Sequence, residues 1–157
     1  MPDAIAIEIS DALAAGLSGH VFSAPYSAID ARRRYFADPE GQDLRSLVVS
    51  VVPGTVETER SSRGQDLFTH EVMIVLARHV DGTDAAADAL MRLCEEIVDA
   101  IRSDLLVTPG MPENARYFGA AMATTFDRDA LMDRRVFLGQ INVTYRVPRD
   151  HVTAQEA

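Results

Sequence analysis

One long segment, residues 65–78, limits the fold more than any other feature of the sequence. It reads as a single extended strand of 14 residues, with Phe68, His70, Val72, Ile74 and Leu76 on one face and Leu67, Thr69, Glu71, Met73, Val75 and Ala77 on the other. Fourteen extended residues span about 46 Å, whereas a compact domain of 157 residues has a diameter of roughly 39 Å. The segment therefore predicts either a strand interrupted by a bulge or a hairpin that projects beyond the body of the domain.

The other periodic segments surround this strand in an order typical of two-layer proteins. Apolar residues at helical spacing predict helices over 3–17 and 84–105, and alternating or β-branched runs predict strands over 27–35, 47–52, 116–126 and 135–147. Pro53-Gly54 is expected to end the strand at 47–52, which leaves 55–64 as an exposed, mobile connection. The connections are mostly of hairpin length. The order therefore predicts an α+β fold, a mostly antiparallel β-sheet with two helices packed on one face.

A single domain accounts for the whole chain. The sequence predicts one α+β domain over residues 1–148, with Pro148 ending the last strand and 149–157 forming a flexible C-terminal tail. The chain start shows no secretory signal, and no apolar stretch is long enough to cross a membrane. Synthesis in a bacterial cytoplasm and no membrane partner are the expectations.

The charge balance excludes one large class of function. Fifteen basic residues, all arginine, stand against 24 acidic residues, and the net charge is −9. Proteins held by nucleic-acid backbones need a concentrated positive field, so tight DNA binding is not expected. GC-rich codon usage is the first explanation for the absence of lysine.

Catalytic and metal-binding patterns are missing from the sequence. There is no G-x-S-x-G nucleophile elbow, and a Walker loop needs a lysine that the chain lacks. Cys94 falls on the apolar stripe of the second helix, where a small core residue is the simplest interpretation. The four histidines have no metal-ligand spacing. The sequence therefore predicts no catalytic residue, no metal site and no cofactor.

The most distinctive local feature is the run Arg32, Arg33 and Arg34 in a predicted strand. On a strand, Arg32 and Arg34 share one face and Arg33 points to the other. Two interpretations remain open. The run is either a solvated edge whose charges discourage aggregation or a patch of salt bridges to a neighbouring subunit.

Several segments together resemble a group of tailed-phage and prophage proteins from the neck and the end of the tail. The segments are the N-terminal helix with Ile5, Ile9 and Leu13, the basic strand ending in Arg34-Tyr35, the run from Asp43-Leu44 to Val52-Pro53, the connection Glu59-Arg60-Ser61-Ser62-Arg63, the strand through Val72-Met73-Ile74-Val75, and the ending from Phe137 to Val147. In this pattern the chain is similar to tail terminator proteins.

The resemblance implies a structural virion protein without enzyme activity. Such a protein forms a ring, commonly a hexamer, at the head-proximal end of the tail tube, where it ends tube polymerisation and joins the tail to the head. Its implied partners are its own copies, the tail tube protein and the head connector or neck proteins, and DNA passes through without specific binding. The residues expected at or near subunit contacts are Arg32, Arg33, Arg34, Glu57, Glu59, Arg60 and Arg63.

Two other functions remain open at this level. A head-completion or stopper protein of the neck has a similar structural role. A small bacterial α+β ligand-binding module is the alternative from another class, and it requires a concave pocket with convergent polar groups.

Overall fold

The computed structural model describes residues 4–35, 44–80, 84–124 and 135–151. Along the chain the elements are α1 (Ile5–Gly19), β1 (Ala31–Arg33), β2 (Val48–Ser62), β3 (Gln65–His79), α2 (Asp84–Arg102), β4 (Arg116–Thr124) and β5 (Val136–Asp150). No helix in these ranges is long and apolar enough to span a bilayer.

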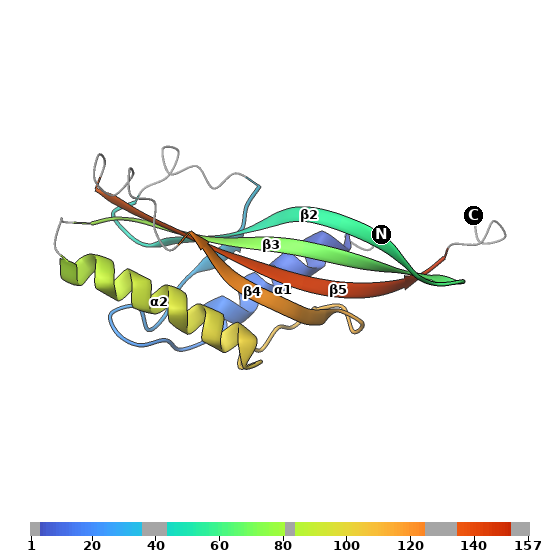
Figure 1. The fold of residues 1–157 in the computed structure, drawn as a ribbon. Coiled ribbons are helices and arrows are strands. Elements are labelled where there is room, and N and C mark those ends of the chain that lie inside the picture. Colours follow the sequence, from blue (N-terminus) through green and yellow to red (C-terminus); the bar gives the residue numbers. More distant parts are fainter. Residues whose placement is uncertain (1–3, 36–43, 81–83, 125–134, 152–157) are drawn as a thin grey trace.

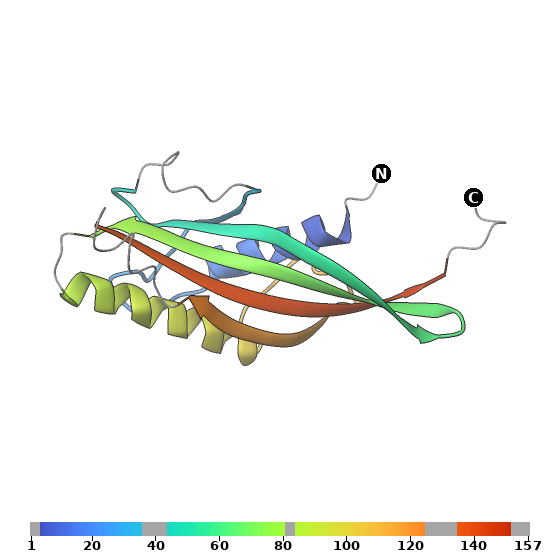
Figure 2. The ribbon, with the colours of Figure 1, turned by 45° about the horizontal axis from the view of Figure 1, so that its top comes forward.

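The five strands form one sheet in the order β1-β2-β3-β5-β4. All neighbouring strands are antiparallel except β1 and β2, which are parallel. Both helices lie on the same side of this sheet, with α1 against β1 and β2 and α2 against β4 and β5 (Figures 1 and 2). The predicted α+β fold is therefore confirmed.

The hydrophobic core lies between the sheet and the helices. Alternate residues of the central strands face the helices, so that Ile74 of β3 lies opposite Ile141 of β5 and both are fully buried. The helices contribute a matching set of buried side chains: Ile9, Leu13, Leu17, Leu90, Leu93 and Ile97. The period of four in α1 and the stripe of α2 read from the sequence are the faces that this core buries. We call the opposite side, which neither helix covers, the open face.

The central hairpin projects beyond the helices, which resolves the question raised by the long strand. β3 pairs with β5 without interruption from Gln65 to His79. The end of the sheet formed by residues 57–69 and 146–150, here called the arm, extends past the helical layer (Figures 1 and 2). Within the arm, all β2 residues from 57 to 62 are exposed.

The prediction that Pro53-Gly54 ends the strand is wrong, because β2 continues through this pair to Ser62. The β2–β3 register shifts between Pro53 and Val56, which marks a β-bulge. A proline is tolerated at this position because β2 pairs with β1 only as far as Val51. Residues 55–62 are therefore strand and not a mobile connection. Their polar composition reflects exposure of both faces, which removes the apolar alternation that reveals a strand.

The predicted strand at 27–35 is mostly irregular, and only Ala31–Arg33 pair with the sheet. The preceding segment satisfies its backbone locally, since the amide of Phe22 donates to the carbonyl of Ser27 at 2.9 Å. Phe22 and Ile29 are buried in the core. Burial of these two apolar side chains holds the segment in place. The alternation of its sequence therefore does not lead to strand pairing beyond residues 31–33.

The last strand is longer than expected, and the second helix is slightly shorter. β5 continues through Pro148 to Asp150, paired with β3 throughout, so Arg149 and Asp150 are not part of a flexible tail. Proline is again compatible because the β4 ladder begins at Arg146 and leaves the other edge of β5 free of strand pairing beyond it. α2 ends at Arg102. Residues 152–157 of the predicted tail lie outside the described residues.

Candidate subunit interface

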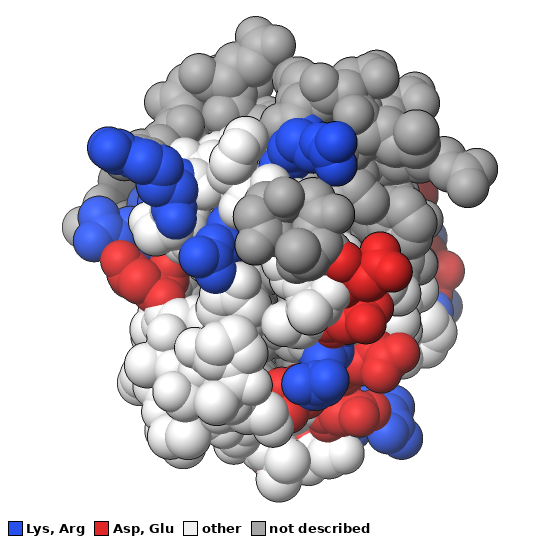
Figure 3. Space-filling model, turned by 90° about the vertical axis from the view of Figure 1, so that its left-hand side faces the viewer, with Lys and Arg blue, Asp and Glu red and all other residues white. Residues whose placement is uncertain are grey.

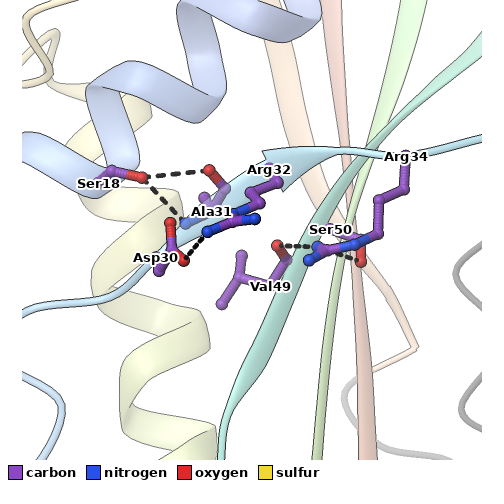
Figure 4. Close-up of polar contacts among 7 residues, drawn as sticks. All are labelled: Ser18, Asp30, Ala31, Arg32, Arg34, Val49 and Ser50. Atoms are coloured by element: carbon purple, nitrogen blue, oxygen red, sulfur yellow. Dashed lines mark hydrogen bonds and ion pairs between the residues drawn. The ribbon is translucent and has the colours of Figure 1, made fainter. Parts of the chain in front are cut away.

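The three consecutive arginines point to two sides of the sheet, as the strand prediction required. Arg32 lies opposite Ser50, whereas Arg33 lies opposite the buried Val51. Arg34 follows on the same side as Arg32 and reaches Ser50 (Figure 4). Arg32 and Arg34 therefore belong to the open face, and Arg33 belongs to the helical side.

Arg34 fastens β1 to β2. Its Nη1 donates to the carbonyl oxygen of Val49 at 3.0 Å and to Oγ of Ser50 at 3.1 Å (Figure 4). Its backbone amide donates to the carbonyl of Val51 at 3.0 Å. A charged donor on a buried strand contributes more than a neutral hydrogen bond. This arginine has an internal structural role.

Arg33 also has partners inside the chain. Its Nε donates to Oδ1 of Asp11 in α1 at 2.8 Å, and its guanidinium lies 5.5 Å from the centre of the Tyr35 ring. Arg32 is the exception, because its side chain is 68% exposed and its ion pair with Asp30, at 3.1 Å, is itself exposed. Such a pair contributes little to stability. Of the three, only Arg32 presents its charge mainly to solvent.

Ser18 positions the start of β1. Its Oγ accepts a hydrogen bond from the amide of Ala31 at 2.9 Å and donates to the carbonyl of the same residue at 3.2 Å (Figure 4). The end of α1 is thus connected to the edge strand through both polar groups of one residue. The arginine run is held in place by this contact and by Arg34.

The other predicted interface residues lie on the arm. Glu57 and Glu59 pair with Thr69 and Leu67, so both carboxylates project from the open face. Arg60 projects from the other face, and Arg63 lies in the turn between β2 and β3. All four are exposed. Among the described residues, none of these four charges has an ion-pair partner.

The structure does not bring the two predicted groups together. Arg33 lies level with Val51 of β2, and Glu57 follows six residues further along that strand. Six extended residues span about 20 Å. The arginine run and the charged arm are therefore two separate surfaces.

The sequence reading missed a third surface, at the edge formed by β4. Arg116 lies directly opposite Arg146 of β5. The guanidinium of Arg146 lies 3.6 Å from the centre of the exposed Phe118 ring, and its Nε is buried without a hydrogen bond in the described part of the chain. Like charges directly across a ladder are unfavourable. No sequence spacing reveals this pair, because thirty residues separate its members and only the register joins them.

A row across the sheet relates this edge to the arm. Glu57 of β2 lies opposite Thr69 of β3, and Thr69 lies opposite Arg146 of β5. Arg146 lies opposite Arg116 of β4. Partners in a ladder project to the same side of a sheet. One row of the open face therefore begins with a carboxylate at one edge and ends with two guanidinium groups at the other.

His70 is a buried residue with no polar partner. Its side chain faces the helices, its residue is 4% exposed, and neither ring nitrogen has a hydrogen bond within the described ranges. Burial lowers the pKa of His70 below its ordinary value, and the nearby positive charge of Arg149 lowers it further. His70 is thus a neutral core residue.

Cys94 and Tyr145 are buried groups whose pKa values are raised. Burial, with a contribution from the charge of Glu95, raises the pKa of the Cys94 thiol to about 12. Burial, with contributions from Tyr117 and Asp104, raises the pKa of Tyr145 to about 12. Neither group is activated as a nucleophile or base at neutral pH. Within the described ranges, no three metal-ligating side chains cluster.

Two surface hollows are relevant to the ligand-binding alternative. One of about 360 Å³ lies between the end of α2 and β4 and contains Arg102, Asp104 and Tyr145. Another of about 540 Å³ lies at the end of the molecule opposite the arm, next to Arg78 and His79. Arg78 there is already engaged, since its guanidinium lies 5.3 Å from the centre of the Tyr26 ring. That end carries both basic and acidic side chains, with no single charge over the whole face (Figure 3).

Comparison with known proteins adds no relative. No protein-family model and no curated protein sequence matches the chain.

Proposed function

We propose that the chain is a structural protein of a phage or prophage tail, which assembles as a ring at the head-proximal end of the tail tube. In this role it ends tube polymerisation, presents a docking surface to the neck and has no enzyme activity. The observation that carries the proposal is the pair of sheet edges that have no strand neighbour in the described residues, one on the charged β2 side of the arm and one on β4. A sheet edge is a template for pairing with another chain.

The surface of the arm supports a role in assembly. The charged side chains of Glu57, Glu59, Arg60 and Arg63, which have no ion-pair partner among the described residues, stand on a hairpin that extends past the helical layer. The β2 part of this extension adds nothing to the core, because residues 57–62 are all exposed, and the arm meets the core only through neighbouring strands, as at Phe68 and Val147. We expect this extension to contact a neighbouring copy or the tail tube.

The net charge of −9 supports a ring through which DNA moves. A lining of the same sign as the phosphates does not retain the duplex.

The test is deletion of the gene from the phage or prophage that encodes it, followed by measurement of tail lengths by electron microscopy. Without a terminator, tube subunits continue to add, so tails longer than wild type with a broad length distribution are expected. Expression of the intact chain from a plasmid restores one length. Tails of wild-type length attached to no heads, or heads that lose their DNA, identify a stopper instead. Particles with no defect contradict a structural role and favour the ligand-binding alternative.

A further inference from the structure

We infer that neighbouring copies of this chain pair edge to edge, with the outer edge of β2 at the base of the arm (residues 54–57) in one copy lying antiparallel to the start of β4 (residues 116–119) in the next, and with Glu57 facing Arg116. This inference deepens the proposed function and rests on its ring of identical subunits. It assigns the two surfaces that form the ring contact, which the resemblance to tail terminators leaves open.

Both edges have backbone groups available for pairing. β2 pairs with β1 only at residues 49–51, so its outer edge from 54 to 62 has no strand neighbour within the described ranges. β4 pairs with β5 on one side and is the last strand of the sheet on the other. In an extended strand, alternate residues direct their N–H and C=O groups to the same edge. Each edge therefore offers a row of donors and acceptors.

The start of β4 carries only part of the usual protection against pairing. Natural edges carry charges, prolines or bulges that discourage another strand. β4 begins at Arg116, and a register shift between Tyr117 and Gly119 marks a bulge, but residues 117–122 contain no charge and no proline and include the exposed rings of Tyr117 and Phe118. This edge is therefore less protected by charge than the arm edge of β2.

The directions of the strands agree with this pairing. β2 runs opposite to β3, β3 runs opposite to β5, and β5 runs opposite to β4. β4 is therefore antiparallel to β2 within one copy. When the next copy is placed beside the first with its sheet continuing in the same sense, its β2 meets β4 antiparallel, which is the more stable geometry for an edge pair.

Charge complementarity sets the register. The row that begins at Glu57 ends at Arg116, through Thr69 and Arg146. When the row continues into the next copy without an offset, the carboxylate of Glu57 meets the guanidinium of Arg116. The adjacent Arg146 then also gains a nearby negative charge, which relieves the like-charge pair at this edge.

The next row gives an independent match on the other face. Val56 lies opposite His70, His70 lies opposite Tyr145, and Tyr145 lies opposite Tyr117. At the two ends of this row, Val56 is 46% exposed and Tyr117 is 39% exposed. The same register brings these two apolar side chains together, and aromatic–β-branched pairs are favourable across a ladder.

Pairing of like edges is less favourable. Two β2 arms side by side bring their Glu57 and Glu59 carboxylates together, and two β4 edges bring their arginines together. Unlike edges make a head-to-tail contact, which repeats around a ring when the rotation closes. Charge thus selects the cyclic arrangement over a two-fold dimer.

The test is disulfide cross-linking of the full-length Glu57→Cys/Arg116→Cys double variant at high protein concentration. Cβ atoms directly across a ladder lie about 4.5–5.5 Å apart, close enough for mild oxidation or a short bismaleimide to join them. A ladder of covalent oligomers that ends at one closed species is expected on non-reducing gels. Cys94 does not contribute, because it is buried and its thiol has a pKa of about 12.

The single-cysteine variants are the matched controls. Glu57→Cys alone and Arg116→Cys alone are expected to give no dimer, because in a head-to-tail contact neither residue meets its own copy. Covalent dimers from either single variant identify a two-fold contact and overturn the proposal. So does the absence of any ladder from the double variant.

A charge exchange tests the register without cysteines. Glu57→Arg and Arg116→Glu are each expected to weaken self-association at least tenfold in sedimentation, and the double exchange to restore it. Equal association of all four proteins overturns the assigned pair. The results of this test and of the gene deletion can be told apart. Cross-linked rings together with normal tails after gene deletion support the subunit contact and reject the terminator role. Overlong tails without cross-links support the terminator role and reject the subunit contact.

Discussion

Glu57 and Arg116 lie in one transverse row of the open face, at opposite edges of the sheet. Thr69 and Arg146 separate them within the chain. Neither charge has an ion-pair partner in the described residues. In the inferred head-to-tail contact, Glu57 of one copy lies directly opposite Arg116 of the next.

The arginines of the first edge strand are expected to differ in their effect on stability. Arg34→Ala removes two hydrogen bonds to Val49 and Ser50 and is expected to lower the free energy of unfolding by about 1–2 kcal/mol. Arg32→Ala is the matched control, with an expected change within about 0.5 kcal/mol because its pair with Asp30 is exposed. Urea unfolding of both variants measures the difference. Equal losses contradict the internal role assigned to Arg34.

The bulge in β2 depends on the absence of a side chain at Gly54. A Cβ at this position lies 2.7 Å from the backbone oxygen of Glu71, so Gly54→Ala is expected to lower the free energy of unfolding by about 1–3 kcal/mol. Gly64→Ala, in the hairpin turn where a Cβ meets nothing within 4 Å, is the control and is expected to be neutral. Thermal unfolding of the two variants measures this difference. Equal destabilisation by both substitutions contradicts the role assigned to close contact at the bulge.

His70 is expected to make stability depend on pH. Burial depresses its pKa in the folded state, so below about pH 6.5 the unfolded chain takes up a proton that the folded chain does not. The contribution of His70 to the free energy of unfolding is fully present above pH 6.5 and falls as the pH drops toward the pKa of the folded state. His70→Leu is expected to flatten this part of the profile and to retain stability at neutral pH. The exposed His79→Gln on the same strand is expected to leave the slope unchanged, and an equal slope in all three proteins excludes His70 as its source.

Cys94 is expected to be unreactive in the native protein. It is 1% exposed, and burial raises its thiol pKa to about 12, so little thiolate forms at neutral pH. Ellman's reagent is expected to release colour only after urea unfolding, to one equivalent per chain. Rapid reaction of the native protein contradicts the placement of this residue in the core.

Patterns that depend on burial could be predicted from the sequence. The alternation of β5, the apolar run of β3 and the stripe of α2 all follow from burial, and the structure has all three elements. The arm segment of β2, residues 57–62, could not be recognised as a strand, because both of its faces are exposed and its sequence therefore has no apolar alternation. The proline at position 148 also misled the sequence reading, since an edge strand tolerates a residue without an N–H group.

The charged surfaces were predictable only in part. Composition indicated an exposed, charged connection that contains Glu57, Glu59, Arg60 and Arg63, but not that both carboxylates share one face. The arginine run was open to two interpretations, a solvated edge or a subunit interface, whereas the structure uses Arg33 and Arg34 within the subunit. The pair of Arg116 and Arg146 depends on strand register, and sequence spacing does not encode it.

Cryo-electron microscopy of the phage or prophage particle that carries this protein tests the central claim most directly. The proposed function predicts density for the chain as a closed ring between the last layer of the tail tube and the neck, and the inferred pairing predicts residues 54–57 of β2 in each copy against the start of β4 in its neighbour. Density within the head-completion layer, or no density for the chain in mature particles, contradicts it.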